Sequence, residues 1–364
     1  MAFSVRNLSI TIDQINENNT FRTGDCISGT VNLELTKEIH IDSFCIKAKG
    51  KASVLWSENY GKGNVTVYDD KETCFKLAQY FVQQQKNQER DGYALLTNET
   101  GQSYPDVVRP GIHVYPFTIQ LPHQDMPVSF KGSHGKVVYF LEAKLCRSKW
   151  IQCKVKESFS YIPRGDMTVP DLTKPQYANK EKKMRFFTSG SVTMNIFTEK
   201  MAYQLGEELK VRIGVVNNCS RSVKPKFCLY QKQSFFARKK RKLRIKELLK
   251  REGKPIEPST TQTITQVLKI PTDIPVSILN CRILKVEYKL KVYLDVKFAS
   301  DPVIKLPVVL FPASESQQAI GVASTDVCAR IESWTSKQEE LNTSALSISP
   351  RHTNHGTYQP LKET

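Results

Sequence analysis

Hydrophobic and polar residues alternate one by one along much of this chain, most clearly in the segment 283–298, ILKVEYKLKVYLDVKF. Successive side chains of a β-strand point to opposite faces, so a period of two predicts a strand buried on one side. We expect its apolar face to lie in a core; that face comprises Val286, Tyr288, Leu290, Val292 and Leu294. The segment 137–145, VVYFLEAKL, repeats nearly the same pattern. Two matching strands indicate a chain that is built twice.

Segments with this period occupy both halves of the sequence and are separated by turn signals rich in glycine and proline. The strands predicted in the first half are Ser9–Ile12, Gly29–Leu35, Ile41–Val54, Val114–Leu121, Val137–Leu145 and Cys153–Tyr161. Those predicted in the second half are Ser191–Phe197, Leu209–Val216, Lys226–Phe236, Thr261–Ile270, Leu284–Phe298 and Val303–Leu310. Residues 74–86 and 238–251 fit either a helix or a strand that enters a hairpin loop. Because other helical periodicity is scarce, the predicted fold class is all-β.

Short motifs recur in the same order in the two halves. In the first half they are Phe21, Gly24-Asp25, Pro122, Pro127 and Tyr139, and in the second Tyr203, Gly206-Glu207, Pro271, Pro275 and Tyr288. The glycine-acid motifs are offset by 182 residues and the tyrosines by 149, so the offset shrinks by 33. We attribute the difference to an inserted loop within residues 57–110. The conserved order predicts two homologous, immunoglobulin-like β-sandwiches in tandem.

Composition divides the chain further. Its 364 residues suffice for two domains, and 40% apolar with 24% charged residues is typical of globular proteins. Residues 163–185 combine three prolines with many charges and lack periodicity, which indicates a linker. The last 52 residues hold fourteen Ser and Thr, a composition typical of disorder. We therefore expect sandwiches at 1–162 and 186–312, joined by that linker, and a disordered tail at 313–364.

The net charge of +17 is unevenly placed, because residues 313–364 carry −2 and the part before them carries +19. Such a surplus implies an acidic partner: nucleic acid, an anionic membrane surface, or acidic or phosphorylated protein segments. No apolar run is long enough to cross a bilayer, and the first residues lack the features of a secretion signal, so we expect a cytosolic protein. Nine cysteines without a Cys-x-x-Cys pair are expected to be small buried hydrophobes.

The segment 238–251, RKKRKLRIKELLKR, holds nine Lys or Arg among fourteen residues. It fits a solvated loop or strand tip, a contact for anionic lipid headgroups or acidic cargo, or a nuclear-targeting or nucleic-acid segment. Aromatic residues are not interleaved with its bases, which argues against nucleic acid. Its candidate contact residues are Arg238, Lys239, Lys240, Arg241, Lys242, Arg244 and Lys246. Lys47, Lys49 and Lys51, at alternate positions of one strand, are further candidates or an ordinary solvated sheet face.

Motifs of catalysis are absent from the sequence. It contains no Gly-x-Ser-x-Gly elbow, phosphate-binding loop, dinucleotide fingerprint, His-Glu-x-x-His pair or EF-hand loop. Six histidines are dispersed, and no carboxylate pair adjoins a recognisable base or nucleophile. We therefore predict no catalytic residue, no cofactor and no metal ligand, and a protein that is not an enzyme.

Five segments carry a resemblance to a known family: GKASVLWSE (50–58), GIHVYPFTIQLP (111–122), SFKGSHGKVVYFLEAKLCR (129–147), VVNNCSRSVKPKFCLYQKQSFFA (215–237) and LKIPTDIPVSILNCRILKVEYKLKVYLDV (268–296). They resemble the arrestin-domain-containing proteins, the α-arrestins, in order over roughly residues 1–312. The resemblance implies two sandwich lobes and an adaptor in membrane-protein trafficking at the plasma membrane and endosomes. Such adaptors bind cytoplasmic parts of receptors or transporters and recruit ubiquitin ligases of the HECT class. A vesicle-coat or retrieval-complex subunit of the same architecture is the alternative.

The tail departs from the family pattern. Family members recruit the ligase through Pro-Pro-x-Tyr motifs, but this chain has no Pro-Pro dipeptide. Its nearest approach, Lys174-Pro175-Gln176-Tyr177, lies in the predicted linker, so direct contact with a WW domain is in doubt. Tyr358 and Leu361 fit a tyrosine-based sorting signal, and the tail residues Val327, Ile331 and Trp334 have the spacing of an amphipathic helix.

Overall fold

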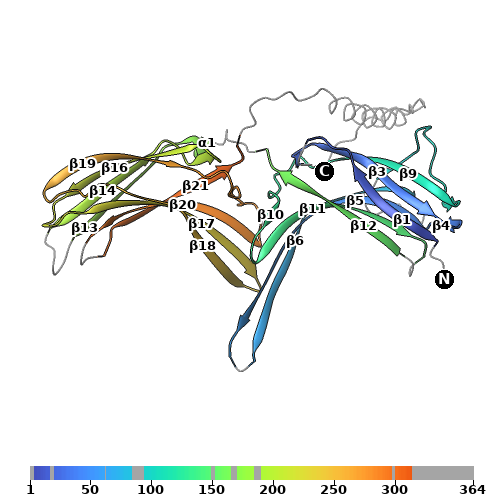
Figure 1. The fold of residues 1–364 in the computed structure, drawn as a ribbon, viewed down its shortest axis with the longest axis horizontal. Helices are drawn as coiled ribbons and strands as arrows, with labels where there is room; N and C mark the ends of the chain where they lie inside the picture. The colour runs from blue at the N-terminus through green and yellow to red at the C-terminus, as the bar shows by residue number, and fades with distance from the viewer. Residues whose placement is uncertain are drawn as a thin grey trace, which may run out of the picture. The chain divides into compact units, whose positions relative to one another are not determined.

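The computed structural model describes residues 4–16, 20–61, 63–83, 94–148, 152–164, 170–183, 190–296 and 300–313. These residues form a nearly all-β fold with two sandwich lobes, as the alternation predicts (Figure 1). Lobe 1 contains β1 (Val5–Ile12), β2 (Thr20–Arg22), β3 (Cys26–Leu35), β4 (Ile39–His40), β5 (Ser43–Asn59), β6 (Val65–Gln83), β7 (Ala94–Leu95), β8 (Val107–Val108), β9 (Gly111–Gln120), β10 (Phe130–Lys131), β11 (Gly135–Cys146) and β12 (Gln152–Ile162). Lobe 2 follows the short helix α1 (Pro170–Thr173) and contains β13 (Gln176–Lys183), β14 (Ser191–Thr198), β15 (Ala202–Gln204), β16 (Glu208–Asn217), β17 (Lys224–Ala237), β18 (Lys240–Glu252), β19 (Thr260–Lys269), β20 (Leu284–Asp295) and β21 (Val303–Phe311).

Lobe 1 packs a three-stranded sheet, in the order β1-β3-β9, against a larger sheet in the order β2-β12-β11-β5-β6-β7. Side chains from both sheets fill the core; the rings of Phe44 (β5) and Tyr115 (β9) meet edge to face at 4.9 Å. Gly50 faces Tyr139 on the neighbouring strand, and a Cβ atom there would lie 2.5 Å from the tyrosine ring. The glycine of the GKASVLWSE segment therefore gives Tyr139 the space it occupies.

Lobe 2 repeats this construction with sheets in the orders β13-β14-β16-β19 and β15-β21-β20-β17-β18. The central strand β20 is the segment with the most regular alternation in the sequence. Its predicted apolar face is confirmed, since every residue from Val286 to Leu294 at alternate positions is at most 1% exposed. Burial of such a face is the main stabilising contribution to a sandwich.

The repeated glycine-acid motif is the same turn in both lobes. The Asp25 carboxylate accepts the backbone N–H of Arg22 at 2.7 Å, and the Glu207 carboxylate accepts that of Gln204 at 2.8 Å. The glycine before each acid has a positive φ, +78° in lobe 1 and +84° in lobe 2, as the third position of a type II turn requires. In both lobes the turn leads into a ten-residue strand, β3 in lobe 1 and β16 in lobe 2.

The repeated proline and tyrosine residues are linked by a hydrogen bond in each lobe. The Tyr139 hydroxyl donates to the carbonyl of Pro127, and the Tyr288 hydroxyl donates to that of Pro275. Both rings are only 1% exposed, and burial raises the pKa of each phenol, so both remain protonated donors. The arrangement is comparable to the tyrosine corner of immunoglobulin-like sandwiches.

The extra length expected within residues 57–110 lies mostly between the end of β6 at Gln83 and the start of β9 at Gly111, because the corresponding connection of lobe 2, from Glu252 to Thr260, is much shorter. β5 and β6 form a hairpin of 17 and 19 residues, longer than the 14 and 13 residues of β17 and β18 in lobe 2 (Figure 1). The first half therefore has a longer middle partly because its hairpin is longer. Near the turn most residues of β6 are exposed or half-buried, with Tyr68 as an exception. Polar residues are therefore tolerated on both faces of the strand there, and the period-two pattern weakens.

Two further segments are resolved in favour of strands. Residues 74–83 lie in β6, residues 84–86 are outside the described residues, and 240–251 lie in β18. The predicted linker 163–185 also contains a strand, because Gln176–Lys183 pairs along its whole length with β14. This edge strand carries few apolar residues and is mostly exposed, so its sequence lacks the alternation of a half-buried strand. The predictions for Val327, Ile331, Trp334, Tyr358 and Leu361 lie outside the described residues.

Candidate functional site

The basic segment of the sequence forms the turn and second strand of the β17–β18 hairpin. Ala237 pairs with Lys240, so Arg238 and Lys239 alone make the turn. Their φ angles are 47° and 64°, which is the left-handed conformation of a type I′ turn. This turn favours Asn-Gly, and side chains with a Cβ atom adopt it at a cost. Two long basic side chains thus occupy a strained turn.

β18 is the terminal strand of its sheet and pairs there only with β17. None of its residues is fully buried. Within the part of the chain that the structure describes, its other edge has no partner strand, so backbone N–H and C=O groups along that edge are available for pairing.

Pairing with β17 decides where each β18 side chain points. Lys242 lies opposite Phe235, Arg244 opposite Gln233 and Lys246 opposite Gln231. Directly paired residues share a face, so these bases and Lys240 form one line on the face of the buried Phe235. We call Lys240, Lys242, Arg244 and Lys246 the basic row. The opposite face of β18 carries Arg241, Leu243 and Ile245, with the two apolar residues 42% and 62% exposed.

Part of the basic segment contacts lobe 1. Lys242 forms an ion pair with Glu58 at 3.0 Å, and Arg238 forms one with Asp69 at 3.1 Å. The Arg244 Nε–H donates to Nε2 of His134 at 3.1 Å. Burial, and then the charges of Arg244 and Lys242, lower the pKa of His134. The imidazole is therefore neutral at physiological pH and can accept this hydrogen bond.

Acids of the β5–β6 hairpin complete the polar contact between the lobes. Glu72 accepts the backbone N–H groups of Arg282 and Ile283 through one oxygen, at 2.9 and 3.3 Å. The Arg282 guanidinium lies 3.4 Å from Asp70. In the sequence these acids are visible only as an acidic cluster, Asp69-Asp70-Lys71-Glu72. Which lobe they would contact is decided only by the tertiary fold.

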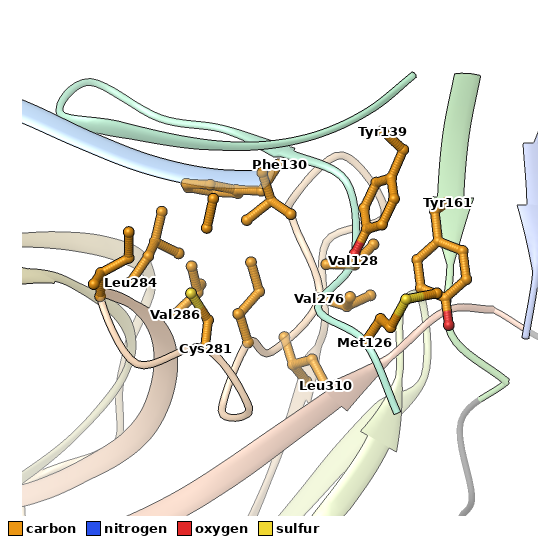
Figure 2. Packing of buried hydrophobic residues seen from close by; sticks show 14 of the residues in the cluster. Met126, Val128, Phe130, Tyr139, Tyr161, Val276, Cys281, Leu284, Val286 and Leu310 are labelled. Atoms are coloured by element: carbon orange, nitrogen blue, oxygen red, sulfur yellow. The ribbon is translucent and has the colours of Figure 1, made fainter. Parts of the chain in front are cut away.

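An apolar junction accompanies these polar contacts. Buried side chains of both lobes belong to one continuous core cluster, including Val128 and Phe130 of lobe 1 and Val276 and Leu284 of lobe 2 (Figure 2). Gly135 lies at this junction, where a Cβ atom would be 2.9 Å from Leu284, Phe235 and Val54. A side chain at that position would separate strands of the two lobes.

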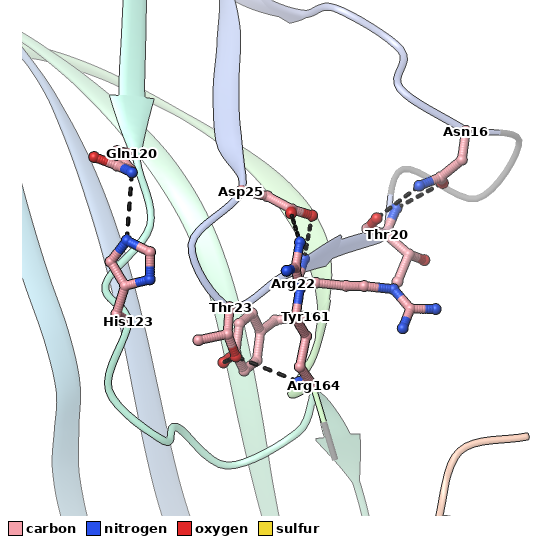
Figure 3. Close-up of polar contacts among 9 residues, drawn as sticks. All are labelled: Asn16, Thr20, Arg22, Thr23, Asp25, Gln120, His123, Tyr161 and Arg164. Atoms are coloured by element: carbon pink, nitrogen blue, oxygen red, sulfur yellow. Dashed lines mark hydrogen bonds and ion pairs between the residues drawn. The ribbon is translucent and has the colours of Figure 1, made fainter. Parts of the chain in front are cut away.

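A cavity of about 440 Å³ adjoins the junction and is lined by residues of both lobes, among them Met126, Val128, Val276 and Leu310. Its polar wall includes Thr23, which shares a 2.8 Å hydrogen bond with the Tyr161 hydroxyl, and Arg164, which pairs with Asp25 at 3.2 Å (Figure 3). These polar groups bond to one another, so the network fixes the end of β12 against the turn that contains Thr23 and Asp25.

The three lysines predicted on the first-half strand are not part of the basic row. Lys49 is ion-paired with Glu142 and has a side chain only 14% exposed. Lys47 lies 6.0 Å from the centre of the Tyr80 ring, and Lys51 is exposed. Lys51 and Glu58 are seven positions apart on β5, so they point to opposite faces of the sheet. The lysines therefore point away from Glu58, and also from Asp70 and Glu72, which pair with Val54 and Ala52 on the Glu58 face.

The described residues contain no group of three or more metal-ligating side chains. Buried thiols are poor nucleophiles here, because burial raises the pKa of Cys281 to about 12 and of Cys228 to about 11. Among the described helices none is long and apolar enough to cross a membrane. The described residues offer charged surfaces and an open sheet edge to a partner.

Comparison with known proteins agrees with the two-lobed fold. Residues 8–168 match the family model "Arrestin (or S-antigen), N-terminal domain", and residues 188–314 match "Arrestin (or S-antigen), C-terminal domain". Arrestin domain-containing protein 4 of Mus musculus is 28% identical over 293 residues, covering 80% of this chain and 68% of the relative. The Homo sapiens protein of that name is 29% identical over the same shares of each chain. Thioredoxin-interacting protein of Homo sapiens is 27% identical, covering 80% of this chain and 71% of the relative. The resemblance seen in the sequence is thus confirmed, and this chain belongs to the α-arrestin family.

Proposed function

We propose that this protein is a non-enzymatic adaptor in membrane-protein trafficking. It binds cytoplasmic segments of receptors or transporters and links them to endocytic, endosomal sorting or ubiquitination machinery. The observation that carries this function is the basic row on an open edge of an arrestin lobe, because such an edge offers both backbone hydrogen bonds and positive charge to an acidic segment. The place of action is the cytoplasmic side of the plasma membrane and of endosomes.

Anionic lipid headgroups are a second class of contact at the membrane. Basic residues near an anionic leaflet contribute about 1 kcal/mol each, so the turn residues Arg238 and Lys239 can support attachment there. Both turn residues are exposed. Nucleic acid is not a favoured partner, since the basic segment has no interleaved aromatic residues.

Ubiquitin ligases are further partners, and this chain recruits them through a contact other than Lys174-Pro175-Gln176-Tyr177, the segment most similar to a Pro-Pro-x-Tyr motif. Gln176 and Tyr177 of that segment belong to β13 and pair with Thr198 and Phe197. A WW domain binds a polyproline II segment, so a paired strand does not present the required conformation, even though Tyr177 is 66% exposed.

Proximity labelling in cells tests the adaptor function. The full chain and a version without residues 313–364 are each fused to a labelling enzyme, with the enzyme alone as control. We expect labelling of membrane cargo and sorting proteins by both chains, with the lobes supplying the cargo contact. If neither chain labels membrane cargo or trafficking machinery, the adaptor function is refuted. A fixed set of partners that co-purifies in constant ratio would instead support the vesicle-coat or retrieval subunit.

A further inference from the structure

We propose that the free edge of β18 binds an acidic peptide in extended conformation, which joins the five-stranded sheet as an additional strand. The inference rests on the proposed adaptor function and names the class of segment that the adaptor takes. The peptide alternates acidic and apolar residues with a period of two.

The backbone of β18 provides the first part of the argument. It is a 13-residue strand with one side paired to β17 and the other side open among the described residues. An open edge usually pairs with another chain unless the sequence prevents it, and edge lysines are a common means of prevention. Positive charge prevents pairing with a second copy of the same basic strand, but it favours an acidic strand. The positive charge of this edge therefore selects acidic strands as partners, in addition to preventing pairing between copies of the protein.

The spacing of the basic row provides the second part. Alternate residues of a strand are about 6.6–6.8 Å apart on one face, in the peptide as in β18. A peptide with an acid at every second position can therefore place its carboxylates beside successive members of the row. On the opposite face, Leu243 and Ile245 are exposed and can pack against the apolar residues of the same peptide. The two faces of β18 thus specify the alternation of the ligand.

The ion pairs already present identify the bases that are free to take part. Lys242 is engaged with Glu58 and Arg244 with His134, both in lobe 1. Within the described residues, neither Lys240 nor Lys246 forms a salt bridge. Contacts of Lys242 and Arg244 with lobe 1 also direct the row toward that lobe. A single extended chain can lie beside β18 there more readily than a planar bilayer, so the geometry favours a peptide over a membrane.

Fluorescence anisotropy with the full chain tests the proposal. The probe is a seven-residue labelled peptide alternating Glu and Val, and its control has the same composition with the glutamates grouped together. A third peptide carries N-methyl groups at alternate residues, which removes backbone donors. We expect the alternating peptide to bind at 0.1 M salt, the grouped peptide to bind at least tenfold more weakly, and the N-methylated peptide not to bind detectably. Equal binding of all three peptides, or no binding of the alternating one, would overturn the proposal.

Two protein variants locate the site. Lys240→Glu with Lys246→Glu changes only bases that make no intramolecular ion pair in the described structure, and we expect at least a tenfold loss of affinity. The matched control, Lys180→Glu with Lys183→Glu, makes the same charge change on β13, the edge strand of the other lobe 2 sheet, and should leave affinity within twofold. An equal loss in both variants would show attraction to net charge and refute the site. Hydrogen exchange of the wild type should show slower exchange of β18 amides when the peptide is bound.

The same variants separate this inference from the adaptor function. Vesicles containing phosphatidylserine are a further probe; if they bind the wild type and lose binding in Lys240→Glu with Lys246→Glu, while no peptide binds, the edge is a membrane contact and the proposal fails. If peptide binding fails but cells still show labelled membrane cargo, the adaptor function stands without this site. If the peptide binds but no membrane cargo is labelled, the edge binds acidic strands and the adaptor function fails.

Discussion

The hairpins β5–β6 and β17–β18 occupy the same position in the two lobes but bring opposite charges to the contact between the lobes. In the larger sheet of each lobe the first strand of the hairpin pairs with a central strand, β11 in lobe 1 and β20 in lobe 2, and the second strand lies outside it. The lobe 1 hairpin presents acids to lobe 2, among them Asp69 and Glu72, and the lobe 2 hairpin presents bases such as Lys242 to lobe 1. Two copies of one fold thus acquired complementary surfaces, because the sandwich constrains buried positions and leaves exposed ones free to diverge.

The returning strands of the two hairpins differ near the turn, because β6 carries a buried aromatic residue there and β18 has no buried residue. Trp56 and Tyr68 stack at 5.3 Å between ring centres and are 4% and 7% exposed. The corresponding end of β18 holds bases and the exposed residues Leu243 and Ile245. Both hairpins contact the other lobe, and among the described residues both returning strands have an unpaired outer edge near the turn, but the edge of β18 is the one rich in bases.

The largest expected difference between the lobes concerns their buried tyrosines. Tyr288→Phe leaves the Pro275 carbonyl unpaired and also removes the partner of the Gln231 amide, which donates to the phenol at 2.7 Å. Tyr139→Phe leaves the Pro127 carbonyl unpaired, while its other polar neighbour is the weakly bonding thiol of Cys74. At about 1–3 kcal/mol for each orphaned buried group, we expect a loss of about 2–4 kcal/mol for Tyr288→Phe and about 1–2 kcal/mol for Tyr139→Phe. Urea unfolding of the two variants measures both, and a larger loss for Tyr139→Phe would contradict the ranking.

A second substitution breaks the contact between the hairpin acids and lobe 2. Glu72→Ala removes the acceptor of two backbone N–H groups, at Arg282 and Ile283. We expect these two amides to exchange at least about tenfold faster, because their protection depends on that carboxylate. Hydrogen exchange with mass spectrometry is the measurement, and Lys71→Ala, an exposed neighbour on the same strand, is the control. Unchanged exchange at Arg282 and Ile283 would show that the acid is not needed for the contact.

The turns of the two hairpins differ in how they accommodate positive φ. The lobe 1 turn uses glycine, including Gly61 at +87°, whereas the lobe 2 turn places Lys239 at 64°. Lys239→Gly should relieve strain and stabilise the protein by up to about 1 kcal/mol, and Gly61→Ala should destabilise it by about 1 kcal/mol. Thermal unfolding of both variants provides the test. If Lys239→Gly lowers the midpoint, the Lys239 side chain contributes more stability than the strain of its backbone costs.

Acidification should have the smallest effect, through the contact of β18 with His134, which lies between β10 and β11. His134 accepts from Arg244 as the neutral form, and its pKa lies below the ordinary value of 6.5. The unfolded state therefore binds a proton first, so stability is full above about pH 6.5 and falls as the pH drops from there toward the folded pKa. The imidazole is half-exposed, so we expect a decrease of less than about 1 kcal/mol between pH 7.5 and 5.5. His134→Gln should remove this part of the pH dependence; an unchanged profile would assign it to other groups.

The sequence by itself determined the strands, the duplication and the family. Period-two alternation identified β20 and β11 because a half-buried strand must place apolar residues on one face, and the glycine-acid and proline-tyrosine motifs recur because the same turn and the same buried hydrogen bond are needed in each lobe. It also identified the basic segment, since charge is a property of composition. Strand β13 was missed because an exposed edge strand needs no apolar face.

Only the tertiary structure decided what the charges face. Along the chain, Lys49 and Lys246 are both basic residues of alternating segments, yet pairing buries Lys49 against Glu142 and leaves Lys246 at an open edge. Glu72 and Arg282 are 210 positions apart, and no local pattern connects them. Sheet order and register are long-range properties, so they alone determine which bases are neutralised within the fold and which remain available to a partner.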